Sequence, residues 1–110
     1  MTAKRGQVYL CMLPGATKPR PVIVLTADWL NGFALDVVVV PVTSVARPTF
    51  PTRVPLVAGE GGLKTRSWAK CDQVSTVPKT ALRGNAFGAM GAAALRSIGA
   101  AIMIALDIDS

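Results

Sequence analysis

Residues 34–43, ALDVVVVPVT, restrict the fold more than any other part of the sequence, because they contain four consecutive valines. β-Branched side chains favour strands, and an apolar run without polar alternation is typical of a strand that is buried on both faces. Pro41 has no N–H to donate to a neighbouring strand, so we expect it at a strand end, an edge or a bulge. The sequence therefore predicts a doubly buried strand here.

Shorter strands are predicted on both sides of this segment, separated by turns rich in proline and glycine. We expect strands at 6–13, at 21–27 and, at a sheet edge, at 52–57, and one or two strands within 67–77. Loops or turns are expected at 14–15, 44–51 and 59–62, and a helical turn at 78–82. Most of the chain before residue 78 is therefore predicted to be β.

A helix is predicted from about Gly88, because Leu95, Ile98, Ile102 and Leu106 recur at helical spacing. Its many alanines and glycines would allow close approach to its own sheet or, in a dimer, to a second copy. Short strands followed by one helix predict a single domain, residues 1–110, that is mainly β with helices. The expected architecture is a small, strongly curved antiparallel sheet or barrel with a C-terminal helix against it.

The composition indicates a basic protein without histidine. The chain has twelve Lys and Arg residues and six Asp and Glu residues, which gives a formal net charge of +6. A concave face of that sign would attract an anionic polymer, whereas a scattered charge would only aid solubility. With Cys11 and Cys71 as the only cysteines, a Cys/His zinc site is not available, and no cofactor is predicted. We expect both to be buried free thiols in a reducing cytosol, which makes a cytoplasmic location the expected one.

No targeting or membrane segment is apparent. The apolar residues near the N-terminus are too few for a signal peptide before Pro14 and Gly15 interrupt them. Arg96 divides the apolar C-terminal stretch, and residues 98–106 alone fall short of the roughly 20 residues that span a bilayer. We therefore expect no contact with a membrane.

Arg20 stands between two prolines in KPRPVIVLT, residues 18–26. Proline fixes its own φ and pushes the residue before it toward extended backbone. Arg20 therefore belongs to a stiff, extended segment that leads into a strand. Such an arginine is either a structural accident or a side chain presented to a ligand.

Several segments, in this order, resemble the MazF/PemK (Kid) toxins of type II toxin–antitoxin systems. RPVxV alone is a weak motif, but VVVPVTS followed later by CDQ is specific, and the likeness extends from Arg5 to the helical tail. The segments are RGQVYLCMLPG, RPVIVLT, VVVVPVTS, GGLKTRSWAKCDQVSTVPKTAL and the tail itself.

The resemblance implies a small SH3-like barrel that forms a homodimer and cleaves single-stranded RNA at short sequences without a metal. Such an mRNA interferase would use the neighbouring 2′-hydroxyl, leave 2′,3′-cyclic phosphate and 5′-OH ends, inhibit translation and arrest growth. The resemblance also implies a cognate antitoxin whose acidic, partly disordered tail neutralises the enzyme.

The same resemblance implies which residues act on the RNA. Arg20 of the RPV motif and Thr43 after the valine strand correspond to the catalytic pair of MazF-like members. Lys70 and Asp72 of the (R/K)CDQ motif are further candidates for catalysis or RNA contact. Lysine there keeps the charge of the usual arginine but lacks its planar fork. Other candidates for binding RNA are Lys18, Ser44, Gln73 and Ser75.

One part of the family pattern is missing. The loop before the arginine usually contains a stretch like GSEQGG, but here it is PGATKP at 14–19, without Glu, Gln or His. The roles of those loop residues in the family therefore do not carry over to this chain.

The chemistry assigns Arg20 to charge stabilisation on the phosphorane. Its guanidinium can contact two phosphate oxygens, and it is a poor general base, since deprotonating it costs more than base catalysis returns. Thr43 could donate a hydrogen bond to the same phosphate. Asp72 could accept the 2′-OH proton, or it could instead form a turn or an ion pair with Lys70.

The aromatic residues divide into two groups. Trp68 and Phe50 are candidates to stack on bases, although a lone aromatic residue in a strand is more often part of the core. Trp29 is interpreted as structural.

Two other classes of function stay open at this point. A gyrase-poisoning toxin of the CcdB type, thought to share this fold, would bind a protein without cutting RNA. A non-catalytic SH3-like module would bind nucleic acid with a salt dependence set by its phosphate contacts but leave the strand intact. Cleavage of RNA in EDTA would separate both from the ribonuclease.

Overall fold

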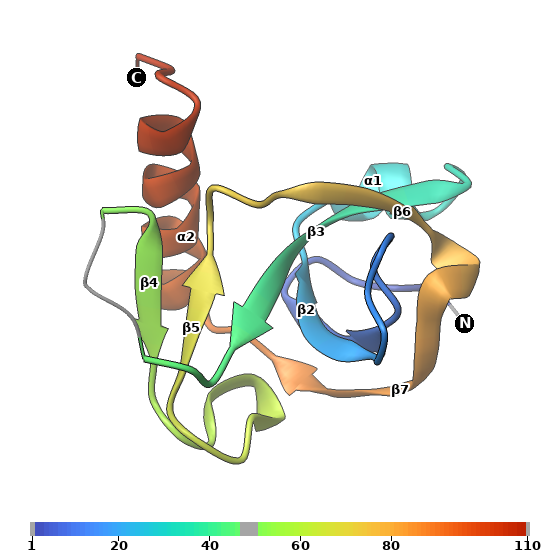
Figure 1. Cartoon of the computed structure of the whole chain (residues 1–110). Helices are drawn as coiled ribbons and strands as arrows, with labels where there is room; N and C mark the ends of the chain where they lie inside the picture. The colour runs from blue at the N-terminus through green and yellow to red at the C-terminus, as the bar shows by residue number, and fades with distance from the viewer. Residues whose placement is uncertain (1, 47–50, 110) are drawn as a thin grey trace.

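The computed structural model describes residues 2–46 and 51–109. The strands of this part are β1 (Gln7–Cys11), β2 (Arg20–Val24), β3 (Asp36–Thr43), β4 (Arg53–Leu56), β5 (Ser67–Lys70), β6 (Ser75–Pro78) and β7 (Leu82–Ala89). The helices are α1 (Asp28–Asn31) and α2 (Ala92–Ala105), and two 3-10 turns are η1 (Glu60–Gly62) and η2 (Lys79–Ala81). Figure 1 shows the strands curling around a core, with α2 standing behind β4 and β5.

All strand pairs are antiparallel, in the order β4-β5-β3-β2-β1-β7, and β6 also pairs with β3. β4 and β7 end this path and do not pair with each other in the described part of the chain, so the sheet is curved but open. The predicted fold class is confirmed: the domain is mainly β, with a strongly curved antiparallel sheet and a C-terminal helix. Of the two forms expected, it is an open sheet and not a closed barrel.

The valine strand is β3, and it is buried on both faces as predicted. Val40 and Val42 belong to the apolar cluster that contacts α2, whereas Val37 and Val39 belong to a second cluster on the opposite face. One edge of β3 pairs with β2, and the other edge pairs first with β6 and then with β5. Pro41 lies inside the strand, between the part paired with β6 and the part paired with β5. Its missing N–H is tolerated because β3 changes partner there.

Two elements differ from the sequence prediction. The strand expected at 21–27 begins one residue earlier and ends at Val24, and the short helix α1 follows it. The helical turn expected at 78–82 is confirmed as η2. A whole strand, β7, follows it at 82–89, where no strand was expected, and the helix predicted from about Gly88 begins only at Ala92. The sequence LRGNAFGA has no β-branched residue, so β7 forms because β1 offers it a partner, not because of local propensity. The region 67–77 forms two strands, one of the two alternatives expected.

The helix α2 packs on its own sheet through its first turns. Ile98 and Ala101 are buried against the cluster that includes β4 and β5, with Leu95 and Ile102 packed beside them. Leu106 was expected on the same stripe but is 60% exposed, because the end of the helix extends beyond the sheet (Figure 1). Within the described residues, no helix is long and apolar enough to cross a membrane.

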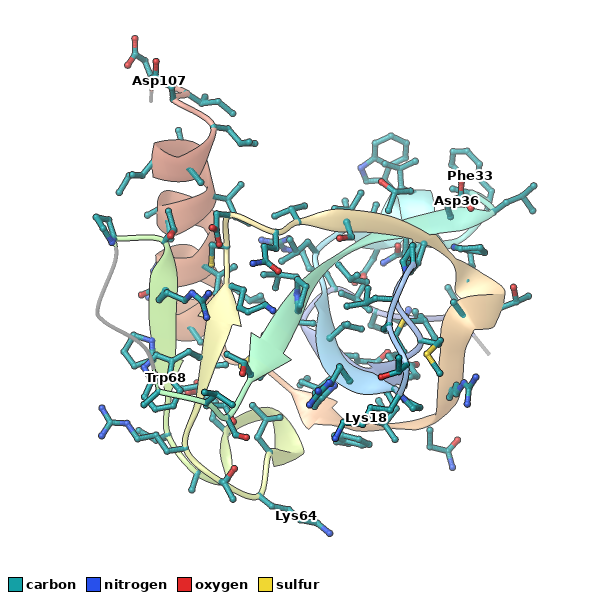
Figure 2. The ribbon with its side chains drawn as sticks, in the orientation of Figure 1. Lys18, Phe33, Asp36, Lys64, Trp68 and Asp107 are labelled. Carbon is teal, nitrogen blue, oxygen red and sulfur yellow. The ribbon has the colours of Figure 1, made fainter. Side chains whose placement is uncertain are left out.

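The interpretation of Trp29 as a structural residue is wrong. Its side chain is 70% exposed on α1, where it lies against Phe33 with ring centroids 6.0 Å apart. The neighbouring apolar strand gave no sign that a surface helix follows it. Figure 2 shows Phe33 at the outer edge of the molecule.

Cys11 and Cys71 are both buried and free, as predicted. Burial and, to a smaller extent, the neighbouring Asp72 carboxylate raise the pKa of Cys71 from 9.0 to about 11. The Cys71 thiol donates a long hydrogen bond to the Ala69 carbonyl, with 3.8 Å between sulfur and oxygen. Cys71 is therefore a protonated core residue at neutral pH.

Ile98 is buried in α2, whereas Leu106 just after the helix is exposed, so substitutions at the two positions should differ in their effect on stability. Ile98→Ala should lower the free energy of unfolding by about 2–5 kcal/mol, because it leaves a cavity in the core. Leu106→Ala should lower it by less than about 1 kcal/mol in the monomer. Urea unfolding at a concentration where the protein sediments as a monomer measures both. An equal loss for the two variants would contradict this packing of α2.

The raised pKa of Cys71 predicts a loss of stability in alkali. The folded state holds the thiol proton more tightly than the unfolded state, so this contribution is complete below pH 9 and is lost as the pH rises to about 11. Over that range the loss from this group amounts to about 2 kcal/mol. Cys71→Ala should show a correspondingly smaller fall in unfolding free energy between pH 8 and pH 10.5. The same fall in both proteins would show that Cys71 does not titrate as described.

Candidate active site

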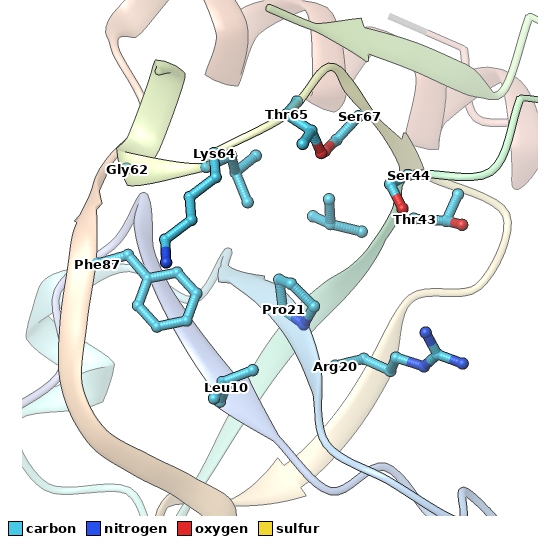
Figure 3. A pocket seen from close by; sticks show the side chains of 12 residues that line it. Leu10, Arg20, Pro21, Thr43, Ser44, Gly62, Lys64, Thr65, Ser67 and Phe87 are labelled. Atoms are coloured by element: carbon cyan, nitrogen blue, oxygen red, sulfur yellow. The ribbon is translucent and has the colours of Figure 1, made fainter. Parts of the chain in front are cut away.

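The pairing of β2 with β3 brings Arg20 and Thr43 together. The register is Val24↔Val39, Ile23↔Val40 and Val22↔Pro41. The paired part of the two strands ends at Val22 and Pro41. Arg20 and Thr43 lie two residues beyond this pair, at the ends of both strands, and both line the same two hollows. Figure 3 shows both side chains projecting to the same side of the sheet.

The backbone holds Arg20 as the sequence predicted. Arg20 is the first residue of β2 and pairs with Cys11 of β1, so its backbone is fixed in an extended conformation. Its side chain is exposed, whereas the next strand residues after Pro21 are buried. The backbone of Arg20 thus lies in a rigid part of the sheet, between two prolines, while its guanidinium is exposed.

The Thr43 hydroxyl is oriented by its own backbone. Its Oγ1 accepts a hydrogen bond from the Val45 N–H at 3.1 Å, and the residue is half-buried. A hydroxyl whose oxygen is engaged in this way still has its O–H proton to donate. Thr43 is therefore suited to donate to a phosphate oxygen beside Arg20.

Arg20, Thr43 and Val42 separate two hollows in the surface. The larger hollow has a volume of about 590 Å³ and the smaller one about 150 Å³. The other residues around the larger hollow are Leu10, Pro21, Ser44, Gly62, Leu63, Lys64, Thr65, Ser67 and Phe87 (Figure 3). Those around the smaller hollow are Leu13, Pro41, Val45 and Lys70. Every charged residue in both linings is a cation, so this part of the surface favours an anionic ligand.

The structure brings together half of the residues proposed from the sequence. Ser44 lines the larger hollow and Lys70 the smaller one, each beside the Arg20–Thr43 pair. The others line neither of these hollows. They are Lys18, exposed before β2; Asp72 and Gln73, exposed after β5; and Ser75, whose hydroxyl donates to the Gln73 carbonyl at 3.0 Å. Phe50 lies outside the described residues.

Sequence reasoning missed the far wall of the larger hollow. Lys64, Thr65 and Ser67 come from the segment between η1 and β5, and Phe87 comes from β7, which was not predicted. Phe87 could not be found because LRGNAFGA carries no strand signal.

Gly62 fixes this wall. Its φ is 81°, and a Cβ there would lie 2.3 Å from the Phe87 carbonyl oxygen, so only glycine allows η1 to contact β7 this closely. The GEGG sequence indicated a turn but not the strand against which the turn packs. The described residues contain no group of three His, Cys, Asp or Glu side chains that could hold a metal ion.

Comparison with known proteins supports the relationship seen in the motifs. The family of PemK-like, MazF-like toxins of type II toxin–antitoxin systems matches residues 4–106. The Mycobacterium tuberculosis toxin MazF-mt6 is 31% identical with a TM-score of 0.83, over 94% of this chain and 99% of that one. An endoribonuclease from a mycobacterial species is 28% identical with a TM-score of 0.84, over 100% and 96%.

A mycobacterial endoribonuclease in complex with its cognate antitoxin is 29% identical with a TM-score of 0.83, over 98% of both chains. No protein of curated function matches the sequence. With nearly its whole length matched, the chain belongs to the PemK-like, MazF-like toxin family of type II toxin–antitoxin systems.

Proposed function

We propose that this chain is an endoribonuclease toxin that cleaves single-stranded RNA at short sequences without a metal ion. The observation that carries the proposal is the Arg20–Thr43 pair, set side by side at the ends of β2 and β3 between two hollows with cationic rims. The mycobacterial relatives described as endoribonucleases support the same activity.

In the proposed reaction the ribose 2′-oxygen attacks the adjacent phosphorus, and the bond to the 5′-oxygen of the next nucleotide breaks. The products are a 2′,3′-cyclic phosphate and a 5′-OH. Arg20 contacts the non-bridging oxygens, on which negative charge grows, and the Thr43 O–H donates to one of them. The Arg20 backbone in β2 and the Thr43 hydroxyl are positioned before substrate arrives, which limits the reorganisation that the protein needs.

The proton transfers are proposed for the KCDQ segment. Lys70 lies at the smaller hollow with Arg20 and Thr43, where its ammonium can stabilise or protonate the leaving 5′-oxygen. Asp72, two residues further along the chain, is the candidate acceptor of the 2′-OH proton. It is exposed after the end of β5, so bound RNA would have to pass over that turn.

The remaining RNA contacts follow from the shape of the surface. The larger hollow has apolar walls from Pro21, Leu63 and Phe87 and hydroxyl groups at Ser44 and Ser67, which suits a nucleobase next to the scissile phosphate. Lys18, Gln73 and Ser75 are proposed to contact the strand on either side. These contacts would decide the cleavage sequence.

Two protein partners are proposed. Three large apolar residues at the end of α2 and just after it, Ile104, Leu106 and Ile108, are each at least half exposed and suit a homodimer contact. A cognate antitoxin with an acidic tail would complement the net charge of +6. The mycobacterial complex of an endoribonuclease with its antitoxin supports this partner, and we propose that both act in the cytoplasm.

The direct test is cleavage of a long single-stranded RNA of diverse sequence in excess EDTA. Wild type should cut it, and Arg20→Ala should be slower by about 10²–10³-fold, because one preorganised donor to the transition state is lost. Arg96→Ala is the matched control, since Arg96 is exposed on α2 and outside both hollows. Mass spectrometry of the fragments should find cyclic phosphate and 5′-OH ends.

Other outcomes separate the alternatives. Equal rates for wild type and Arg20→Ala would remove Arg20 from the mechanism but keep the enzyme class. If folded wild type leaves the RNA intact, the ribonuclease proposal fails. Binding without cleavage would then favour a nucleic-acid module, and no binding would favour a toxin that acts on a protein.

A further inference from the structure

The outward face of β5 carries an alternating row of cations and an aromatic ring. Ala69 and Cys71 are buried in the cluster that includes Ile98 of α2, so Lys70 and Trp68 project from the opposite face, as does Arg66 just before the strand. The guanidinium carbon of Arg66 lies 5.4 Å from the centroid of the Trp68 ring, a cation–π contact.

The neighbouring strand β4 adds a second cation opposite Lys70. The β4–β5 register pairs Arg53 with Lys70 and Pro55 with Trp68, so Arg53 projects from the same outward face. Both residues are half-buried. Like charges placed directly opposite each other across strands destabilise a sheet. The repulsion between Arg53 and Lys70 therefore destabilises the free protein, and a bound anion would remove this repulsion.

The strands of the sheet supply no carboxylate to neutralise this pair, and the exposed Asp72 lies beyond the end of β5. The four strands β2, β3, β5 and β4 contain a single acidic residue, Asp36. It lies at the far end of β3, where it pairs with Pro78 of β6. Arg53 and Lys70 thus form a cationic site at the part of the sheet that is distant from its one acid.

This site continues from the candidate active site. The row Arg20, Thr43, Trp68 crosses β2, β3 and β5, and Lys70 lines the smaller hollow beside the first two. From β2 to β4 the row crosses three strand spacings, or about 14 Å at roughly 4.8 Å each. This backbone separation places Arg53 to contact a different phosphate from the one beside Arg20.

We propose that Arg53 binds a second phosphate of the RNA strand, next to the one that Arg20 and Lys70 contact, with Trp68 supporting a base between the two phosphates. This inference rests on the proposed ribonuclease function and extends its binding surface onto β4. Aromatic rings interleaved with cations suit a strand in which bases alternate with phosphates, better than they suit an acidic peptide. Figure 2 shows Trp68 on the face of β4 and β5 that looks away from α2.

The test measures binding of a mixed-sequence, fully 2′-O-methylated single-stranded RNA, which lacks the attacking hydroxyl. Arg53→Gln should weaken binding about tenfold and reduce the slope of log K against log salt by about 0.7, the value for one phosphate contact of a single strand. Arg53→Lys should keep the slope, and Arg96→Gln, on α2, should change neither quantity. The melting temperature of Arg53→Gln should be unchanged or higher, because a like-charged pair is removed.

Each remaining outcome decides the question. If Arg53→Gln binds the methylated RNA with the same affinity and the same salt slope as wild type, and wild type cleaves RNA, the proposed second-phosphate site is wrong. The proposed ribonuclease function would then remain. A lower melting temperature in Arg53→Gln together with weak binding by Arg53→Lys would make Arg53 structural and overturn the proposal. If Arg53→Gln weakens the binding of poly-glutamate but not the binding of RNA, the Arg53–Lys70 pair serves an acidic protein, and the proposal is overturned. If Arg53→Gln shows the expected loss of RNA affinity and salt slope but wild type cleaves no RNA, the phosphate site is supported and the ribonuclease function is refuted.

Discussion

The burial of β3 on both faces is the constraint on which the rest of the structure depends. Its valines belong to two apolar clusters, one against α2 and one on the opposite side, so shifting its register by one residue would exchange their environments. Its two edges pair with three other strands. The curvature of the sheet and the relative positions of β2 and β5 both follow from this one strand.

The candidate active site is a consequence of that register. Thr43 ends the buried strand, Arg20 begins the strand beside it, and the apolar pairs of the two strands bring both residues to the same hollows. Binding groups at the ends of well-packed strands are positioned by the core without forming part of it. The exposed Arg20 therefore gains its rigidity from Val22 and Ile23, which contact no ligand.

Sequence reasoning predicted the parts of the fold that local chemistry determines. Val37 to Val40 could be assigned to a doubly buried strand because their side chains leave few alternatives. The strand β7 could not be predicted, because its glycines and alanines become a strand only when β1 pairs with them. For the same reason the motifs identified Arg20 and Thr43, whereas Phe87 and the contact of Gly62 with it required the three-dimensional structure.

The structure shows where part of the excess positive charge lies. The cations at Arg20, Lys70 and Arg53 come from three separate strands, and only the strand pairing shows that they share one face of the sheet. Sequence could establish the excess of positive charge but not its arrangement. The arrangement gathers these cations on one face, which suits an anionic ligand and supports the proposal of a single RNA strand.

The central claim is that Arg20 and Thr43 act on one phosphate, and a double-mutant cycle tests it most directly. Single-turnover RNA cleavage would be measured for wild type, Arg20→Ala, Thr43→Val and the double variant. If both side chains contact the same phosphate, the double variant should lose markedly less than the product of the two single losses, with a coupling of about 0.5–3 kcal/mol. Losses that simply multiply would show that the two residues act independently and would contradict the site described here.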